Sequence, residues 1–147
     1  NRWIEHHINV RGLTSDYRIA TGVKNLGGKP GKNTTGGWLW TWGERRGTSA
    51  STKLGMGVIF PVAEFDRFED LTTHESGVDA LTTLMRPNAG GFLTYHAFSL
   101  WGNAAHGLQT REEFDEYVQI TATALNTPPV VKISPAESEQ DNNGSKK

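Results

Sequence analysis

Three tryptophans alternate with other residues along one short segment, and this spacing constrains the fold more than any other feature. Trp38, Trp40 and Trp42 recur at every second position, which matches the side-chain period of a β-strand and not that of a helix. Residues 37–43 are therefore predicted to form a strand with three indoles on one face, about 6 to 7 Å apart. Two interpretations stay open: the indoles fill a core, or they form a platform for sugar rings.

Most of the remaining chain also has the pattern of strands separated by turns. The segment Pro87-Asn88-Ala89-Gly90 is typical of a turn and predicts a β-hairpin between the strands on either side of it. Apolar and polar residues alternate, or β-formers cluster, in the segments predicted to be strands, which are 3–11, 17–23, 53–60, 78–86, 91–101 and 130–133.

One helix is predicted, near residues 110–126. Thr110 and Glu113 have the spacing of a capping box, in which each side chain accepts a hydrogen bond from a backbone N–H of the first turn. An apolar stripe at helical spacing follows, and Pro128 and Pro129 end it. The members of the stripe are Phe114, Tyr117, Val118, Thr121 and Leu125.

Many strands with a single late helix predict a mainly β fold, an antiparallel β-sandwich with one α-helix on its C-terminal side. Regular helices between the strands, which parallel βαβ units require, are missing from the pattern. Residues 1–133 are predicted to form the sandwich, as a portion of a larger domain. Residues 134–147 are polar and charged and are expected to be a solvated tail.

Charge and composition exclude several classes of function. The chain carries 15 basic and 16 acidic residues, so it has no excess of positive charge for a phosphate backbone, and we expect no nucleic-acid partner. No run of about 18 apolar residues is present, so we expect no membrane span. No cysteine set, metal-ligand spacing or phosphate-binding loop occurs, and neither cofactor nor metal is expected.

Candidate site residues lie on three predicted strands and one loop. His7 and Arg11 belong to the polar side of the first strand, where they provide a proton acceptor and a cation. Tyr95, His96 and Trp101 lie on the strand 91–101, although alternation directs Tyr95 and His96 to opposite faces. Arg18 and His74 complete the set from other segments. For every one of these residues, an ordinary structural role remains the alternative.

Four segments occur in an order that resembles one protein family. They are RGLTSDYRIATGV at 11–23, KLGMGVIFP at 53–61, GFLTYHAFSLWG at 91–102 and TREEFDEYV at 110–118. Together they resemble the C-terminal half of a β-supersandwich family from bacterial polysaccharide-utilisation loci, similar in fold to galactose mutarotase and to several polysaccharide lyases. The resemblance implies that an N-terminal portion of the same protein completes the fold.

The resemblance also implies a secreted or periplasmic protein that acts on uronate-containing oligo- or polysaccharide as a carbon–oxygen lyase or dehydratase. By residue type, Arg11 or Arg18 would neutralise the uronate carboxylate, and His7, His74 or His96 would remove the C5 proton. Tyr95 would protonate the leaving oxygen, and Trp101 with the indoles at 38, 40 and 42 would bind the sugar. The alternative is a non-catalytic carbohydrate-binding sandwich.

Overall fold

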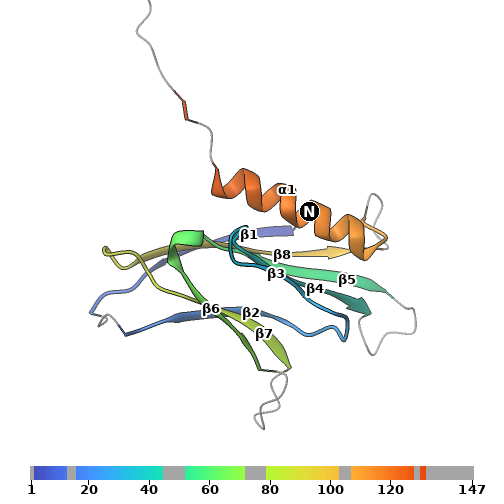
Figure 1. The fold of residues 1–147 in the computed structure, drawn as a ribbon, viewed down its shortest axis with the longest axis horizontal. Coiled ribbons are helices and arrows are strands. Elements are labelled where there is room, and N and C mark those ends of the chain that lie inside the picture. The colour runs from blue at the N-terminus through green and yellow to red at the C-terminus, as the bar shows by residue number, and fades with distance from the viewer. Residues whose placement is uncertain are drawn as a thin grey trace, which may run out of the picture.

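The computed structural model describes residues 2–12, 16–44, 52–71, 79–102, 107–127 and 130–131. Eight strands, one short 3₁₀ helix and one α-helix follow one another along the chain (Figure 1). Their bounds are β1 (Arg2–Asn9), β2 (Ile19–Lys24), β3 (Gly31–Asn33), β4 (Trp38–Glu44), β5 (Lys53–Ile59), η1 (Val62–Glu64), β6 (Phe65–Asp70), β7 (Ala80–Met85), β8 (Phe92–Trp101) and α1 (Arg111–Asn126).

The strands form two antiparallel sheets. Sheet A has the order β1-β8-β5-β4-β3, and sheet B has the order β2-β7-β6. Sheet B packs on one face of sheet A, and α1 lies across the other face, so the described part of the chain has three layers (Figure 1). The predicted mainly β sandwich with one C-terminal-side helix is confirmed.

The central strands β4 and β5 of sheet A are buried on both faces, because each face packs against a different layer. The core between the sheets consists of Val23, Leu39, Val58, Phe60, Leu81, Met85, Leu93 and Tyr95. The core between sheet A and α1 consists of Trp38, Trp40, Trp42, Ile59, Phe98, Phe114, Val118 and Ala122. Alternate residues of β4 therefore enter different cores, with Leu39 facing sheet B and its two tryptophan neighbours facing the helix.

The tryptophans on β4 fill a core and do not form a sugar platform. Trp38, Trp40 and Trp42 are only 7%, 1% and 7% exposed beneath α1. The indole N–H of Trp40 donates to the carboxylate of Asp115 on the helix at 2.9 Å, which supplies the polar partner that a buried indole requires. The strand prediction is correct. The substrate-binding role predicted for these three residues is not compatible with their burial, because α1 covers the face they share.

Glycines on sheet A provide the room for this aromatic layer. A Cβ atom at Gly55 would lie 2.2 Å from the ring of Phe114, and one at Gly57 would lie 2.2 Å from the ring of Phe98. Both distances are far below van der Waals contact. Phe114 contacts Trp40 edge-on with ring centroids 5.6 Å apart and Trp42 at 5.3 Å. The glycine spacing on β5 thus allows the helix to approach the sheet closely.

The helix begins as predicted. The Thr110 hydroxyl accepts from the Glu113 backbone N–H at 3.1 Å, and the Glu113 carboxylate accepts from the Thr110 backbone N–H at 3.1 Å. The buried side of α1 differs by one position from the predicted stripe. Ala122 is buried and Leu125 is 38% exposed, and in the last turn Asn126 faces the sheet instead, where its amide donates to the Gly36 carbonyl at 3.1 Å.

Two predicted strand features are wrong. The turn after Pro87 exists, with the Gly91 N–H donating to the Asn88 carbonyl at 2.8 Å, but it is not a β-hairpin. β7 pairs with β2 and β6 in sheet B, whereas β8 pairs with β1 and β5 in sheet A, so this turn crosses between the sheets. Residues 130–131 are not in a strand, and 132–133 and the predicted tail at 134–147 lie outside the described residues.

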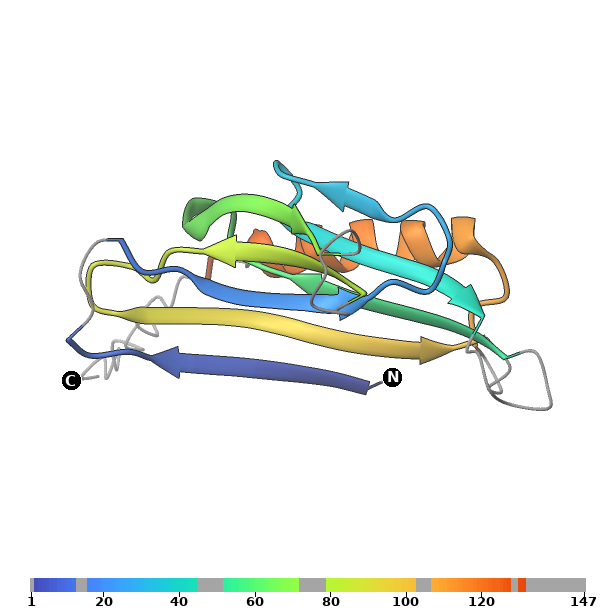
Figure 2. The same ribbon diagram turned by 90° about the horizontal axis from the view of Figure 1, so that it is seen from below.

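The first strand ends at Asn9, and its face toward sheet B is only partly covered. Ile8 packs against the core between the sheets, but Ile4 is 59% exposed. Figure 2 shows β1 at the margin of sheet A, beyond the three strands of sheet B. The opposite face carries Trp3, which stacks on Phe98 with centroids 4.6 Å apart and donates to the Tyr117 hydroxyl at 2.7 Å.

We expect Gly55→Ala to lower the free energy of unfolding by about 1–3 kcal/mol, because the new methyl group would displace the Phe114 ring from its close contact with the sheet. Chemical denaturation of the full chain measures the change. Ala20→Val, which adds carbon to an exposed position on β2, is the matched control and should change stability by less than about 0.5 kcal/mol. Equal stability of the Gly55→Ala variant and the parent would contradict this packing.

Candidate functional site

The predicted site residues do not converge on one cleft. His7 and His96 lie on the face of sheet A that carries α1, whereas Tyr95 lies on the face toward sheet B. Arg11 and Arg18 belong to one end of the sandwich, and Trp101 ends β8 at the other. His74 lies outside the described residues. Each location therefore has to be considered by its own chemistry.

The two described histidines of the predicted set form a polar patch beside α1. His96 is opposite Glu5 in the β1–β8 register, and the edge of its ring faces Trp3 at a centroid distance of 6.4 Å. Burial lowers the pKa of His96 below its usual 6.5, which favours the neutral imidazole at neutral pH. His7 hydrogen-bonds the Thr94 hydroxyl at 3.1 Å and lies 3.4 Å from the Glu5 carboxylate.

Tyr95 is a core residue and not a partner of His96. Its side chain is 9% exposed, and its ring stacks on His6 with centroids 4.6 Å apart and planes 11° apart. No bulge interrupts the β1–β8 register between residues 92 and 99, so alternation holds and the two side chains point to opposite faces. The predicted base and acid of β8 are consequently separated by the sheet itself.

An open pocket of about 640 Å³ lies at the end of the sandwich where β1 leads into β2 and β7 leads into β8. We call it the arginine pocket. Two guanidinium groups, a phenol and an amide line it, and none of its described lining residues is acidic. The lining residues are Val10, Arg11, Gly12, Tyr17, Arg86, Pro87, Asn88, Ala89, Gly90 and Gly91. This composition favours an anionic ligand.

The rim of the arginine pocket is shaped by Gly91 and Asn88. Gly91 has φ +78°, and a Cβ atom there would lie 2.2 Å from the Val10 carbonyl oxygen, so only glycine allows the two chain segments to meet. The Asn88 Oδ1 accepts from the backbone N–H of Gly90 at 2.9 Å and of Phe92 at 3.1 Å. These two bonds fix the Asn88 amide at the rim of the pocket.

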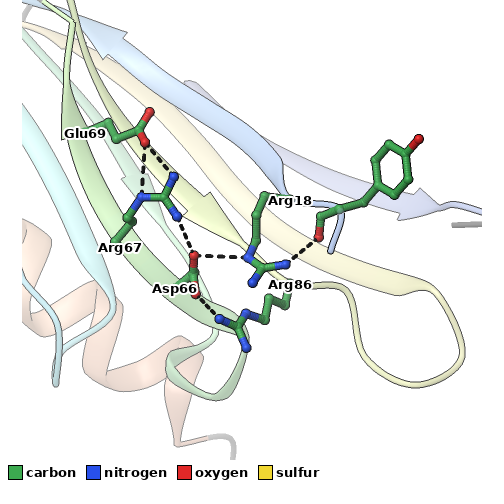
Figure 3. Close-up of polar contacts among 6 residues, drawn as sticks. Arg18, Asp66, Arg67, Glu69 and Arg86 are labelled. Carbon is green, nitrogen blue, oxygen red and sulfur yellow. Dashed lines mark hydrogen bonds and ion pairs between the residues drawn. The ribbon is translucent and has the colours of Figure 1, made fainter. Parts of the chain in front are cut away.

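One carboxylate orients the arginines behind the pocket. Asp66 on β6 accepts from Arg18 Nε at 3.0 Å, from Arg67 Nη1 at 2.8 Å and from Arg86 Nη2 (Figure 3). Arg67 is also held by Glu69 at 2.7 Å. The Asp66 side chain is 12% exposed, and a carboxylate shared by three guanidinium groups is a rigid anchor.

Arg18 therefore orients the site and does not line it. It donates to Asp66 and, through Nη1, to the Tyr17 carbonyl oxygen at 3.0 Å, so it links the position of Tyr17 to that of Asp66 (Figure 3). The hydrogen bond from Arg18, with a smaller contribution from Arg86, holds the pKa of Asp66 below its usual 3.8 although burial opposes the shift. Asp66 remains ionised at any pH near neutral.

Sequence reasoning missed Tyr17, Arg86 and Asn88. Each of them belongs to or borders a turn: Tyr17 directly follows the turn residue Asp16, Arg86 precedes the turn at 87–90, and Asn88 lies within it. Polar residues beside turns at the ends of strands are a general signal of function. That signal does not tell which turns meet, and the two turns here belong to segments about 70 residues apart.

Within the ranges that the structure describes, no three histidine or acidic side chains lie together as a metal site would require. None of the helices there is both long and apolar enough to cross a bilayer.

Comparison with known proteins decides the family. A family described as "Domain of unknown function (DUF4861)" matches residues 1–131. The chain belongs to this family. No curated protein matches it with significance, and no solved structure does. The match extends from β1 through α1, so the matched region of this chain includes both sheets and the helix.

The Asp66 anchor should give a distinct pH dependence of stability. Because the pKa of Asp66 is lower in the folded protein than in the unfolded chain, its ion pairs stabilise the fold above about pH 4, and this contribution disappears as the pH falls through the folded value. The difference in free energy of unfolding between the parent and Asp66→Asn should be constant near neutral pH and shrink in acid. Glu116→Gln on the exposed side of α1 is the control. A difference that grows in acid would contradict the assignment.

Proposed function

We propose that this protein acts on uronate-containing oligo- or polysaccharide and catalyses β-elimination or dehydration. The observation that supports this proposal is the arginine pocket, which presents Arg11, Arg86 and Tyr17 to a ligand without an acidic residue among its described lining. A uronate carboxylate matches a guanidinium fork in charge and geometry.

The reaction requires three functions at one sugar ring. A cation pairs with the uronate carboxylate, which makes the C5 proton acidic and stabilises the enolate-like charge that develops when it leaves. A base takes that proton, the C4–C5 double bond forms, and the C4–O bond breaks. An acid gives a proton to the departing oxygen, which leaves as an alcohol in β-elimination and as water in dehydration.

In our proposal the arginine pocket provides these functions in part. Arg11 and Arg86 bind the carboxylate, and the Tyr17 hydroxyl, which belongs to a side chain 56% exposed, transfers a proton. Arg18 and Asp66 position these groups from behind (Figure 3). Tyr17 thus replaces the core residue Tyr95 as the phenol of the mechanism. His7, His74 and His96 are the base candidates by residue type alone, because neither His7 nor His96 lines the pocket and His74 lies outside the described residues.

The same proposal includes three further points. They are the resemblance to the mutarotase-like supersandwich family, a secreted or periplasmic location, and completion of the fold by another portion of the protein. Exposed Ile4 and the marginal position of β1 favour an additional layer or strand on that side of sheet A. A polysaccharide substrate, which is too large to enter a cell intact, favours the location.

One observation favours a second candidate, a non-catalytic carbohydrate-binding sandwich. His96 and Tyr95 lie on opposite faces of sheet A, and the described lining of the arginine pocket contains no histidine. A binding module needs the cations that select the sugar but needs no base. Turnover distinguishes the two candidates.

The test is turnover of uronate oligosaccharides by the full protein, followed by the absorbance of the unsaturated uronate product. Arg11→Met and Arg86→Met should each reduce kcat/KM by about 10²- to 10³-fold, and Tyr17→Phe should reduce kcat by about 10²- to 10⁴-fold. Arg67→Met is the matched control, because Arg67 shares the same aspartate but does not line the pocket; it should retain most of the activity.

Three further variants locate the base. Loss of turnover in His96→Ala or His7→Ala, with Tyr95→Phe unaffected, would assign it to the patch beside α1. Full activity in all three would exclude that patch. Uronate binding without turnover in the parent protein would favour the binding module, and absence of both would overturn the proposal.

A further inference from the structure

We propose that the opposite end of the sandwich holds a second carbohydrate site, which takes a neutral sugar ring. A pocket of about 620 Å³ opens there, within the range of small-molecule sites. We call it the tryptophan pocket. Its described lining combines an apolar floor with polar, cationic and anionic side chains. The described lining residues are Lys24, Asn25, Leu26, Gly27, Glu44, Leu54, Met56, Asp79, Ser99 and Trp101.

The floor of the tryptophan pocket comes from β5 and β8. Leu54 is opposite Trp101 and Met56 is opposite Ser99 in the antiparallel register, so these four side chains share one face of sheet A. The Trp101 side chain is partly buried, unlike the indoles of β4. An indole beside aliphatic side chains offers the apolar C–H face of a sugar a matching surface.

The wall of the pocket is held in place by a close backbone contact. β2 ends at Lys24, and the chain then passes over the end of β4, where a Cβ atom at Gly43 would lie 2.2 Å from the Leu26 carbonyl oxygen. The Asn25 backbone N–H donates to the Asp79 carbonyl at 3.0 Å, and the Asn25 side-chain Oδ1 accepts from the Gly27 N–H at 2.9 Å. These bonds fix the positions from which Lys24 and Asp79 project.

The charges of the described residues around this pocket cancel. Lys24 contributes one positive charge and Glu44 and Asp79 one negative charge each, and Lys53 balances Glu44 through an ion pair of 2.9 Å. A uronate carboxylate would meet two carboxylates here, whereas the arginine pocket has none in its described lining. Carboxylates, an amide, a hydroxyl and an ammonium group provide both acceptors and donors, as the hydroxyls of a neutral sugar require.

The two pockets lie too far apart for one sugar ring to occupy both. Phe92 begins β8 next to the arginine pocket and Trp101 ends it in the tryptophan pocket; ten residues of strand extend about 30 Å. The tryptophan pocket is thus a separate binding site, and the inference does not depend on the proposed uronate chemistry.

The experiment is a titration of the ¹⁵N-labelled full protein with the methyl glycosides of glucose, galactose, mannose, xylose and rhamnose, observed at the indole N–H signals. Trp101→Phe assigns the signal of Trp101. We expect at least one neutral glycoside to shift this signal with a Kd of about 1 to 10 mM. The signals of the three tryptophans on β4 should stay unchanged, because α1 covers them.

Variants separate this site from the arginine pocket. Asp79→Asn keeps the shape of an exposed side chain and should weaken binding by about tenfold, because it replaces a charged acceptor. Glu116→Gln on α1 is the matched control and should bind as the parent does. Arg86→Met should leave this binding unchanged even if it abolishes uronate turnover, so the two proposals fail independently.

Three results would overturn the inference. The first is no shift of Trp101 with any of the five glycosides at up to about 100 mM, well above the expected Kd. The second is tighter binding of methyl glucuronide, which would indicate an anion site. The third is tighter binding of glucosamine that Asp79→Asn abolishes, which would indicate a site for cations.

Discussion

The insertion of Phe114 between Trp40 and Trp42, directly over Gly55, is the contact on which the rest of the structure depends. It brings α1 against sheet A and buries three indoles that would otherwise form a large apolar surface. Dispersion and hydrophobic burial stabilise such a contact only when the rings approach closely, and the glycine at residue 55 permits that approach. A central sheet covered on both faces follows from this one arrangement.

Burial of both faces decides where ligands can bind. Sheet A offers no open platform over β4 and β5, so binding is directed to the ends of the sandwich and to the uncovered margin at β1. Two pockets of the described chain lie at those ends, where turns and strand termini bring polar residues together. The proposed sites are thus a consequence of how the faces are used.

The two ends differ in electrostatics. At one end, Asp66 binds three guanidinium groups from three strands or their termini. It fixes the position of Arg86, which lines the arginine pocket, whereas Asp66 itself is not among the described lining residues. At the other end, the described lysines and carboxylates balance around Trp101. A chain with a net formal charge of −1 thereby presents one cationic and one nearly neutral pocket, and such a difference is a basis for selecting different sugars.

Local patterns in the sequence predicted local structure well. The two-residue period of the tryptophans indicated β4, the Thr110 and Glu113 pair indicated the start of α1, and alternation separated Tyr95 from His96; each depends only on neighbours in the chain. Only the tertiary structure decided that the indoles are covered, that the turn after Pro87 joins two sheets, and that Tyr17 and Arg86 line one pocket. The physical reason is that side-chain period specifies two faces of a strand but not which layer covers each face, because packing joins segments far apart in the sequence.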